Sequence, residues 1–554
     1  MTRRERSTLL GLWFFLGLLP LLVRPLWEPD EGRYAEIPRE MLATGDWLTP
    51  HLNGVLYFEK PPLQYWLSAL SMKLFGLTGA AARLPLALAS GLMLWAAWRL
   101  AKRLGAREPL WAAFMAATGL LAFILGQLLT LDALFSAFLV AALAALVEAV
   151  TQRRAGSSGL GWTLATFTLL AGAMLTKGLA EVILTGGILL GSLLFAWKDP
   201  DLRRAVLRTA FDPLGWLLYL VLVVPWFWAV NRANPGHAQF FFIHEHFTRF
   251  LTHEHARQGS NNWLLDKLYF VGFLGVGLLP WLSATLIGLK RTWTFLRGRG
   301  PQAQDHLARW TVGLVAMGFL WPLVFFSLSG SKLPPYILPT IVPLAALACA
   351  FERSGEEARA LGRMGRELLV LGALFLAAAA FFRTHLVGWP WLLALGAGYA
   401  GLGLWAQRPK GLSGPRLMTA FGAALWLLLL AAEATAGPGK CVADLVRRAP
   451  ADAQWICYDV YFQGLPFYAR TRAVVVAGTG ELAFGRDRLP DAARWFKEDP
   501  AALGAVADRL KAERPDRPVL VMAKEAAWKE QSLAERERWE VVTRSPAALV
   551  ARRR

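Results

Sequence analysis

Two acidic side chains stand where a carboxylate could take part in chemistry. Asp30 lies in the segment Glu28-Pro29-Asp30-Glu31-Gly32-Arg33, just after a long apolar run. Asp132 opens another apolar run as Thr130-Leu131-Asp132-Ala133. An ionisable residue at the edge of a membrane span is a functional candidate, and the alternatives are a solvated loop for Asp30 and helix capping for Asp132. A carboxylate at a site of chemistry can take part in proton transfer.

Basic side chains accompany these acids in the segments that connect the apolar runs. They are Arg33, Lys60, Lys177, Arg249 and Lys332. Each alone could be a membrane anchor that extends its charged end into the interface. Together they could surround one anionic ligand at the outer face of a membrane. A phosphate suits this set, because Arg offers planar bidentate donors and Lys offers a point charge.

Histidines gather in one segment, where a metal site is conceivable. Five of the eight lie in 232–267, namely His237, His244, His246, His253 and His255. Two His-Glu-His triplets occur there, but side chains at i and i+2 diverge on a helix or strand and form no ready-made tetrahedral site. One His with a carboxylate from the first loop, such as His244 with Glu59, is the arrangement to test. Metal binding and a histidine-rich loop without metal both remain open.

The composition requires membrane spans to position these residues. The chain has 554 residues, of which 55% are hydrophobic and 18% charged, against roughly 25% charged in soluble domains. Each span needs about 20 mostly apolar residues. Thirteen runs qualify, at 8–26, 83–101, 108–128, 131–150, 160–176, 179–197, 211–231, 268–289, 310–328, 335–352, 367–383, 388–406 and 415–433.

Basic residues predict how the spans are oriented. Alternate connections are rich in Arg and Lys, which places them and the N-terminus in the cytoplasm. The excess of basic residues in the cytoplasmic connections therefore accounts for much of the net charge of +19. No nucleic-acid partner is expected. Two long loops, 27–82 and 232–267, then lie outside. Amphipathic stretches at 35–43 and 63–75 could lie along the interface.

The residues after the last span change character. Short β-like runs at Ala473–Ala477, Val519–Met522 and Val541–Thr543 alternate with helical stretches at Asp491–Phe496 and Ala501–Arg514. We therefore expect a membrane domain, 1–433, and a small outer α/β domain, 434–554. Cys441 and Cys457 lie in the outer domain, where a disulfide is permitted, but the sequence does not show that they pair.

Several motifs resemble a known family. Asp30-Glu31-Gly32-Arg33-Tyr34-Ala35-Glu36, with Arg39-Glu40-Met41, Gly45-Asp46-Trp47 and Tyr57-Phe58-Glu59-Lys60-Pro61, is similar to the first periplasmic loop of the aminoarabinose transferases. These are polyprenyl-phosphate-dependent glycosyltransferases of the GT-C fold, related to protein O-mannosyltransferases. Further matching segments are Thr130-Leu131-Asp132, Leu175-Thr176-Lys177-Gly178, Glu245-His246, Arg249-Phe250, Ser331-Lys332-Leu333-Pro334, Tyr336-Ile337-Leu338-Pro339, and Tyr461 with Leu465-Pro466-Phe467-Tyr468.

The resemblance implies a fold and a reaction. The fold would be a polytopic α-helical membrane protein of the GT-C type, with about thirteen spans and a C-terminal α/β periplasmic domain. The enzyme would sit in the bacterial inner membrane, as a monomer among membrane lipids. It would move 4-amino-4-deoxy-L-arabinose from undecaprenyl phosphate to a lipid A phosphate on the periplasmic side, with inversion.

The resemblance also implies residue roles. Asp30 and Asp132 match acids of the GT-C active site. Residues around the donor phosphate and substrate would be Arg33, Tyr34, Tyr57, Lys60, Lys177, Arg249, Lys332 and Tyr336. A divalent metal, zinc, would be held by Glu59 and His244, although His246 or His255 could serve instead.

Two other functions remain open. The first transfers a different polyprenyl-linked sugar to a hydroxyl of a protein or another glycolipid. The second is a secondary transporter, which would carry ionisable residues in mid-span and paired broken helices. The unusual charges here stand at the outer ends of spans instead, which favours the enzyme.

Overall fold

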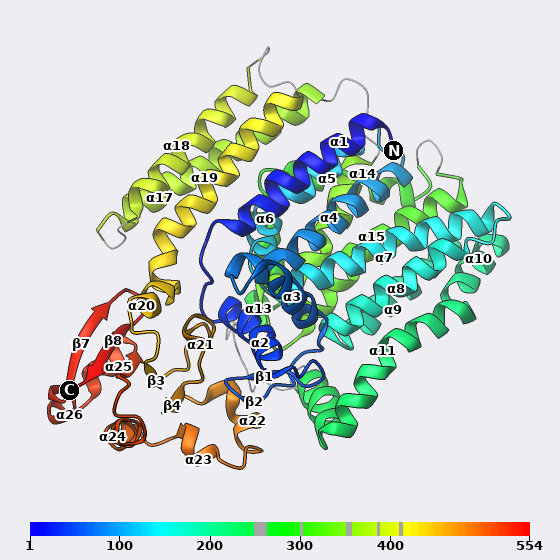
Figure 1. The fold of residues 1–554 in the computed structure, drawn as a ribbon. Coiled ribbons are helices and arrows are strands. Elements are labelled where there is room, and N and C mark those ends of the chain that lie inside the picture. The colour runs from blue at the N-terminus through cyan, green and yellow to red at the C-terminus, as the bar shows by residue number, and fades with distance from the viewer. Residues whose placement is uncertain (249–262, 300–302, 351–356, 385–387, 409–413) are drawn as a thin grey trace. The chain divides into compact units, whose positions relative to one another are not determined.

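The chain folds into two compact units. The structure, a computed structural model, describes residues 1–248, 263–299, 303–350, 357–384, 388–408 and 414–554 (Figure 1). The first unit comprises Met1–Leu21, Glu59–Leu63 and Pro85–Ala431, and the second comprises Leu22–Phe58, Gln64–Leu84 and Ala432–Arg554. Most of the predicted outer loop 27–82 therefore belongs to the same unit as the C-terminal tail.

The first unit is built from apolar helices. They are α1 (Arg3–Leu12), η1 (Trp13–Leu18), η2 (Leu19–Leu22), α4 (Gly79–Arg103), α5 (Leu110–Thr118), α6 (Leu120–Gly126), α7 (Leu131–Arg154), α8 (Leu160–Lys177), α9 (Ala180–Ala196), α10 (Pro200–Ala210), α11 (Pro213–Ala233), η3 (Gln239–Thr248), α13 (Trp263–Gly277), α14 (Leu282–Leu296), α15 (His306–Leu328), η4 (Pro334–Thr340), α16 (Ile341–Cys349), α17 (Glu357–Phe382), α18 (Trp389–Ala406) and α19 (Gly414–Lys440). A helix satisfies its backbone polar groups internally, as the lipid interior requires.

Fewer helices meet a strict span criterion than the sequence predicts. Within the described residues, seven helices are long and apolar enough to cross a membrane, or eight if one bent pair counts as a span. The chain is thus a multi-pass membrane protein. The number thirteen stays a prediction.

Two of the predicted spans contain a break in the structure. The run 268–289 is divided between α13 and α14, whose axes differ by 117°, because Gly277 and Pro280 cannot sustain the helix between them. The run 108–128 is divided at Gly119, whose extended backbone ends α5 before α6 begins. Apolarity continues through both breaks, so composition alone does not reveal them.

Helix α7 is the central helix of the first unit. Of its apolar window, 94% is buried, and its neighbour α8 returns antiparallel after a short connection (Figure 1). The start of α7 and the end of α8 therefore meet. This places Asp132, in the first turn of α7, beside Lys177, in the last turn of α8.

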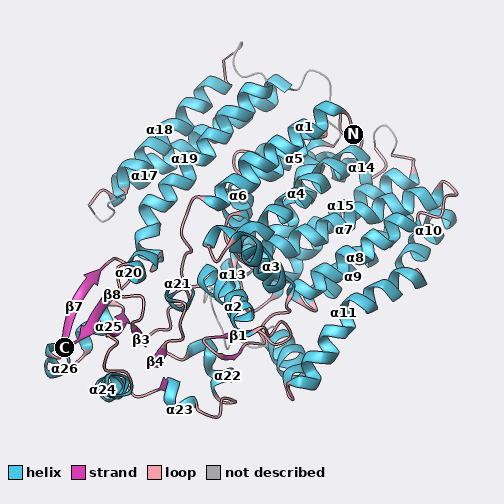
Figure 2. Cartoon of the chain, viewed as in Figure 1, coloured by secondary structure: helices cyan, strands magenta, loops and turns pink. Residues whose placement is uncertain are grey.

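The second unit holds a mixed sheet, coloured magenta in Figure 2. Strands β3 (Gln454–Tyr458), β4 (Val474–Val476), β5 (Phe496–Lys497), β6 (Val519–Ala523), β7 (Trp539–Arg544) and β8 (Leu549–Arg553) lie in the order β5-β4-β3-β6-β8-β7. The first four are parallel, and β8 pairs antiparallel with β6 and β7. Its helices and 3-10 turns are α20 (Ala443–Arg447), α21 (Leu465–Ala469), η5 (Gly480–Leu482), α22 (Ala483–Arg486), α23 (Ala492–Trp495), η6 (Pro500–Ala502), α24 (Leu503–Glu513), α25 (Glu525–Glu530) and α26 (Leu533–Glu537).

The predicted α/β character of the tail is confirmed. β4, β6 and β7 fall on the three predicted β-like runs, and α23 and α24 fall on the two predicted helical stretches. Strands β3, β5 and β8 were not predicted. Cys441 and Cys457 are both free thiols, so the permitted disulfide does not form.

The outer-loop segment of the second unit forms a helix and a hairpin. Helix α2 (Asp30–Thr44) covers the stretch 35–43, and ten of its residues are buried, so protein packing covers most of this helix. Its position along the membrane interface stays a prediction. The hairpin β1 (His51–Leu52) and β2 (Val55–Leu56) turns at Asn53-Gly54, both with positive φ. Helix α3 (Leu63–Phe75) exposes Leu70, Leu74 and Phe75, which suits an interfacial position.

Candidate active site

Arg33 organises the first turn of α2 in the second unit. Its guanidinium is buried. It forms ion pairs with Asp30 Oδ1 at 3.1 Å and Glu481 Oε2 at 3.0 Å, and it donates a hydrogen bond to the Tyr57 hydroxyl oxygen at 3.2 Å. The Asp30 carboxylate one turn away is 54% exposed. Arg33 is therefore held in place by acids, and Asp30 keeps one face open for another group.

One predicted tyrosine, Tyr34, lies on the same helix. Tyr34 is buried and stacks on Tyr65 of α3, with ring centroids 6.0 Å apart. The Arg33 guanidinium lies 5.7 Å from the Tyr34 ring, within the range of a cation–π contact. These contacts restrain the side chains on which a bound sugar could rest.

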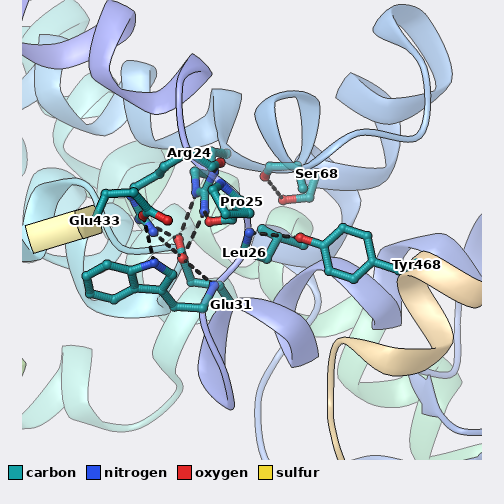
Figure 3. Close-up of polar contacts among 10 residues, drawn as sticks. Arg24, Pro25, Leu26, Glu31, Ser68, Glu433 and Tyr468 are labelled. Carbon is teal, nitrogen blue, oxygen red and sulfur yellow. Dashed lines mark hydrogen bonds and ion pairs between the residues drawn. The ribbon is translucent and has the colours of Figure 1, made fainter. Parts of the chain in front are cut away.

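Glu31, next to the exposed Asp30, is buried and pairs with two arginines. Figure 3 shows its carboxylate close to Arg24. Arg24 donates to it at 2.6 and 2.8 Å, and Arg83 donates to it twice at 2.8 Å. Burial alone would raise the pKa of Glu31, but Arg83 and Arg24 outweigh burial and hold that pKa at about 2. The doublet Asp30-Glu31 thus separates into an exposed acid and a buried anchor.

Glu28 joins the loop to the tail within the second unit. Its carboxylate accepts the backbone N–H groups of Gln463 at 2.8 Å and Gly464 at 2.6 Å. Burial raises the pKa of Glu28 to about 8 although both bonds lower it. A Cβ added at Gly32 would stand 2.4 Å from the Gly464 nitrogen, so only glycine permits this close approach.

In the first unit the structure brings Asp132, Lys177 and Tyr336 together. Lys177 Nζ forms an ion pair with Asp132 and lies 4.5 Å from the Tyr336 ring centroid. Phe135 and Phe326 also lie around the ammonium, at 5.4 and 6.0 Å. An ammonium among aromatic faces in a poorly hydrated site interacts strongly with any anion that reaches it.

Lys332 occupies a different environment. Its side chain is fully buried, and its Nζ bonds Asp266 Oδ2 at 3.0 Å as well as the Ser329 carbonyl oxygen. It therefore ties the connection between α15 and η4 to α13. The predicted contact of Lys332 with a donor phosphate stays a prediction, and the observed contacts indicate a positioning residue.

Lys60 also carries an acidic partner. Its Nζ lies 3.1 Å from Glu245 Oε2 and donates to the Glu59 carbonyl at 2.7 Å. His244 Nδ1 lies 3.8 Å from the other Glu245 oxygen. Across the described part of the chain, no three or more His, Cys, Asp or Glu side chains form a group that could hold a metal ion. Glu59 and His244 alone do not make a metal site; the side chain of His246, and His253 and His255, lie outside the described residues.

The predicted cations thus occur as ion pairs rather than as bare charges. Arg33, Lys60, Lys177 and Lys332 each contact a carboxylate, and Arg249 lies outside the described residues. The partners Glu481 and Asp266 were not singled out from the sequence. Asp266 borders the predicted span 268–289, so the boundary criterion that selected Asp132 could have found it; no local signal marks Glu481.

Two comparisons define the class. Residues 59–228 match the family model for dolichyl-phosphate-mannose-protein mannosyltransferase. The chain superposes on the crystal structure of ArnT from Cupriavidus metallidurans bound to undecaprenyl phosphate with a TM-score of 0.78 and 27% identity, covering 99% of this chain and 97% of that one. Its apo structure gives a TM-score of 0.76. The fold is that of a GT-C membrane glycosyltransferase, and the chain is an enzyme of that class.

Sequence relatives narrow the class further. The chain is 34% identical over 450 residues to the undecaprenyl phosphate-alpha-4-amino-4-deoxy-L-arabinose arabinosyl transferase of Pseudomonas paraeruginosa, which covers 77% of this chain and 75% of that protein. It therefore belongs to the family of these arabinosyl transferases. The same-named protein of Edwardsiella ictaluri is 34% identical over 401 residues, 69% of this chain and 68% of its own length. The arabinosyl transferase 1 of Sodalis glossinidius is 35% identical over 351 residues, which cover 62% of this chain and 58% of that protein.

Proposed function

We propose that this enzyme transfers 4-amino-4-deoxy-L-arabinose from undecaprenyl phosphate to a phosphate of lipid A, with inversion. The names of the family members and the undecaprenyl phosphate in the related crystal structure support this donor. The observation that carries the proposal within this chain is Lys177, an ammonium enclosed by Asp132 and three aromatic rings.

The geometry suggests how Lys177 contributes. The bond between C1 of the sugar and the donor phosphate oxygen breaks, and that oxygen keeps the electron pair. Lys177 stabilises the growing negative charge where water is scarce. The ion pair with Asp132 keeps the Lys177 ammonium in position, and the donor phosphate contacts the same ammonium when it binds. An oxygen of the acceptor phosphate attacks C1 from the opposite face, which gives inversion.

A phosphate acceptor also assigns Asp30 its role. A lipid A phosphate is already anionic near neutral pH, so no proton has to be removed. Asp30 would then orient the acceptor or pair with the ammonium of the sugar. Arg33, fixed by Glu481 and Tyr57, would hold the Asp30 carboxylate in position.

The remaining predictions belong to the same proposal. The protein would act as a monomer in the bacterial inner membrane, with its charged pairs and C-terminal domain on the periplasmic side. Lys60 and Arg249 would assist at the donor phosphate. A zinc ion at Glu59 and His244 would need further ligands, and no step above depends on it.

Mass spectrometry of lipid A tests the proposal directly. Cells that carry the gene should show lipid A with added aminoarabinose, and cells without it should not. A strain that carries Lys177→Ala, expressed at the normal level, should resemble the strain without the gene. Unmodified lipid A in the strain with abundant wild-type protein would contradict the proposal.

The match to the mannosyltransferase model favours one second candidate. In that case a polyprenyl-linked sugar would be moved to a hydroxyl of a protein or another glycolipid. Glycosylated protein that disappears with the gene, together with unchanged lipid A, would select this candidate.

A further inference from the structure

A polar cavity lies where α17 and α18 meet, and none of its lining residues belongs to the charged pairs described above. Its volume is about 350 Å³, and it is lined by Arg359, Gly362, Arg363 and Arg366 of α17 and by Gln407 at the end of α18. Figure 1 shows α17 and α18 running side by side in the yellow-green part of the chain. All five residues belong to the first unit.

The three arginines form one basic face. Their spacing of four and then three residues places them on the same side of a helix. In the described part of the chain, none of the three has a carboxylate partner. Glu367, the acid next to Arg366, instead accepts the N–H groups of Leu282 at 2.8 Å and Ser283 at 2.7 Å. Arg363 Nε is buried without a hydrogen-bond partner.

Close helix packing fixes the cavity. A Cβ added at Gly365 would stand 2.8 Å from the Gly403 carbonyl oxygen and 2.9 Å from Gln407 Cγ. Glycine therefore lets the two backbones touch and sets Gln407 opposite the arginines. By contrast, a Cβ at Gly362 would meet nothing within 4 Å, so the cavity is open above that residue.

The surface beside the cavity is apolar. Val370 and Leu374 follow Arg366 at intervals of four residues and are 55% and 53% exposed. On the neighbouring helix Leu404 is 58% exposed. A basic cavity followed along the helix by an exposed apolar stripe matches a ligand with an anionic head and a hydrocarbon chain.

We propose that this cavity binds the phosphodiester head group of an anionic phospholipid, with the acyl chains along Val370 and Leu374. Guanidinium groups suit phosphate because they offer planar paired donors, and basic pockets between membrane helices recognise such head groups. The alternation of basic loops predicts that this end of α17 faces the cytoplasmic leaflet. The inference does not depend on the proposed sugar transfer.

Lipid binding to the purified full-length protein tests the inference. Dioleoyl phosphatidylglycerol is titrated into protein in neutral detergent, and bound lipid is counted by native mass spectrometry. Arg359→Gln/Arg363→Gln/Arg366→Gln should weaken the tightest lipid site by about tenfold or more. A matched triple variant, Arg204→Gln/Arg297→Gln/Arg299→Gln, removes the same charge from exposed arginines and should change affinity less than about twofold.

Two single variants control for the possibility that the triple variant loses lipid binding because it misfolds. Gly362→Glu adds a carboxylate to the cavity without a clash and should weaken lipid binding, whereas Gly362→Ala should leave it unchanged. Equal affinity in wild type and the first triple variant would overturn the inference. So would inorganic phosphate that displaces the lipid at equal concentration, because the site would then recognise a free ion.

Discussion

Lys177 and Lys332 are the same residue type in similar short connections, yet their surroundings differ. Lys177 keeps 13% of its side chain exposed and faces aromatic rings, whereas Lys332 is fully buried against Asp266 and a carbonyl oxygen. The first can meet a ligand, and the second holds two elements together. This contrast gives each lysine a separate experimental signature.

We expect Lys177→Ala to fold and to lower turnover by about tens to hundreds of fold, the effect of losing a charge-assisted bond worth about 2–3 kcal/mol. Lys332→Ala should lower the unfolding temperature more than Lys177→Ala does, since it removes a fully buried ammonium that bonds both Asp266 and the Ser329 carbonyl oxygen. Turnover of the folded fraction and thermal unfolding, measured on both variants, separate the two roles. Wild-type turnover in Lys177→Ala would rule out its contact with the donor.

Asp30 distinguishes the two possible acceptors. Asp30→Asn keeps the shape and one acceptor oxygen, so it should retain part of the activity if the acceptor is a phosphate. The rate should also not rise with pH through the range in which a carboxylate base ionises. Loss of about 10²–10⁴-fold in a folded variant that still binds donor would indicate a general base and a hydroxyl acceptor.

At the scale of elements, the sequence predicts those features whose signal lies within one element and misses those that depend on contacts between distant segments. The apolar runs of α7 and α8 and the β-branched run of β4 were readable from the sequence, because each signal lies within the element. The break between α13 and α14 was not, because the residues on both sides are apolar. Glu481, which pairs with Arg33, could not be predicted, because it comes from a remote segment and no local signal marks it. Asp266, which pairs with Lys332, was also missed, although its position at the edge of a predicted span could have pointed to it.

The buried Glu31 predicts how the second unit responds to acid. Its carboxyl has a pKa of about 2 when folded, against 4.5 for an unperturbed group. A lowered folded pKa stabilises above the unfolded value, so this stability is complete above about pH 4.5 and is lost as the pH falls towards 2. The difference corresponds to about 3 kcal/mol.

Unfolding midpoints of the purified protein between about pH 6 and pH 3 check this expectation. Glu31→Gln should be less stable at pH 6 and should lose less stability on acidification. Asp452→Asn, at an exposed position of the tail, should follow the wild-type curve. An acid limb that is identical in wild type and Glu31→Gln would contradict the role of Arg24 and Arg83.

For the whole molecule, orientation is the property that the basic loops predict. In a background with Cys441→Ser, cysteines at Ala43 and Asp516 should react with an impermeant thiol reagent in intact spheroplasts. A cysteine at Ser157 should react only after the membrane is opened. All three positions are exposed in the structure, and the two other native cysteines are buried. Labelling of the cysteine at Ser157 alone would show that the orientation is the reverse of the predicted one.

Reconstituted transfer is the most direct measurement of the central claim. Purified protein in lipid vesicles is given undecaprenyl phosphate-linked aminoarabinose and lipid A, and both products are followed by mass spectrometry. We predict equal amounts of undecaprenyl phosphate and aminoarabinose-modified lipid A, with little of either from Lys177→Ala. Donor consumption without modified lipid A, or equal activity of the folded Lys177→Ala protein, would contradict the account.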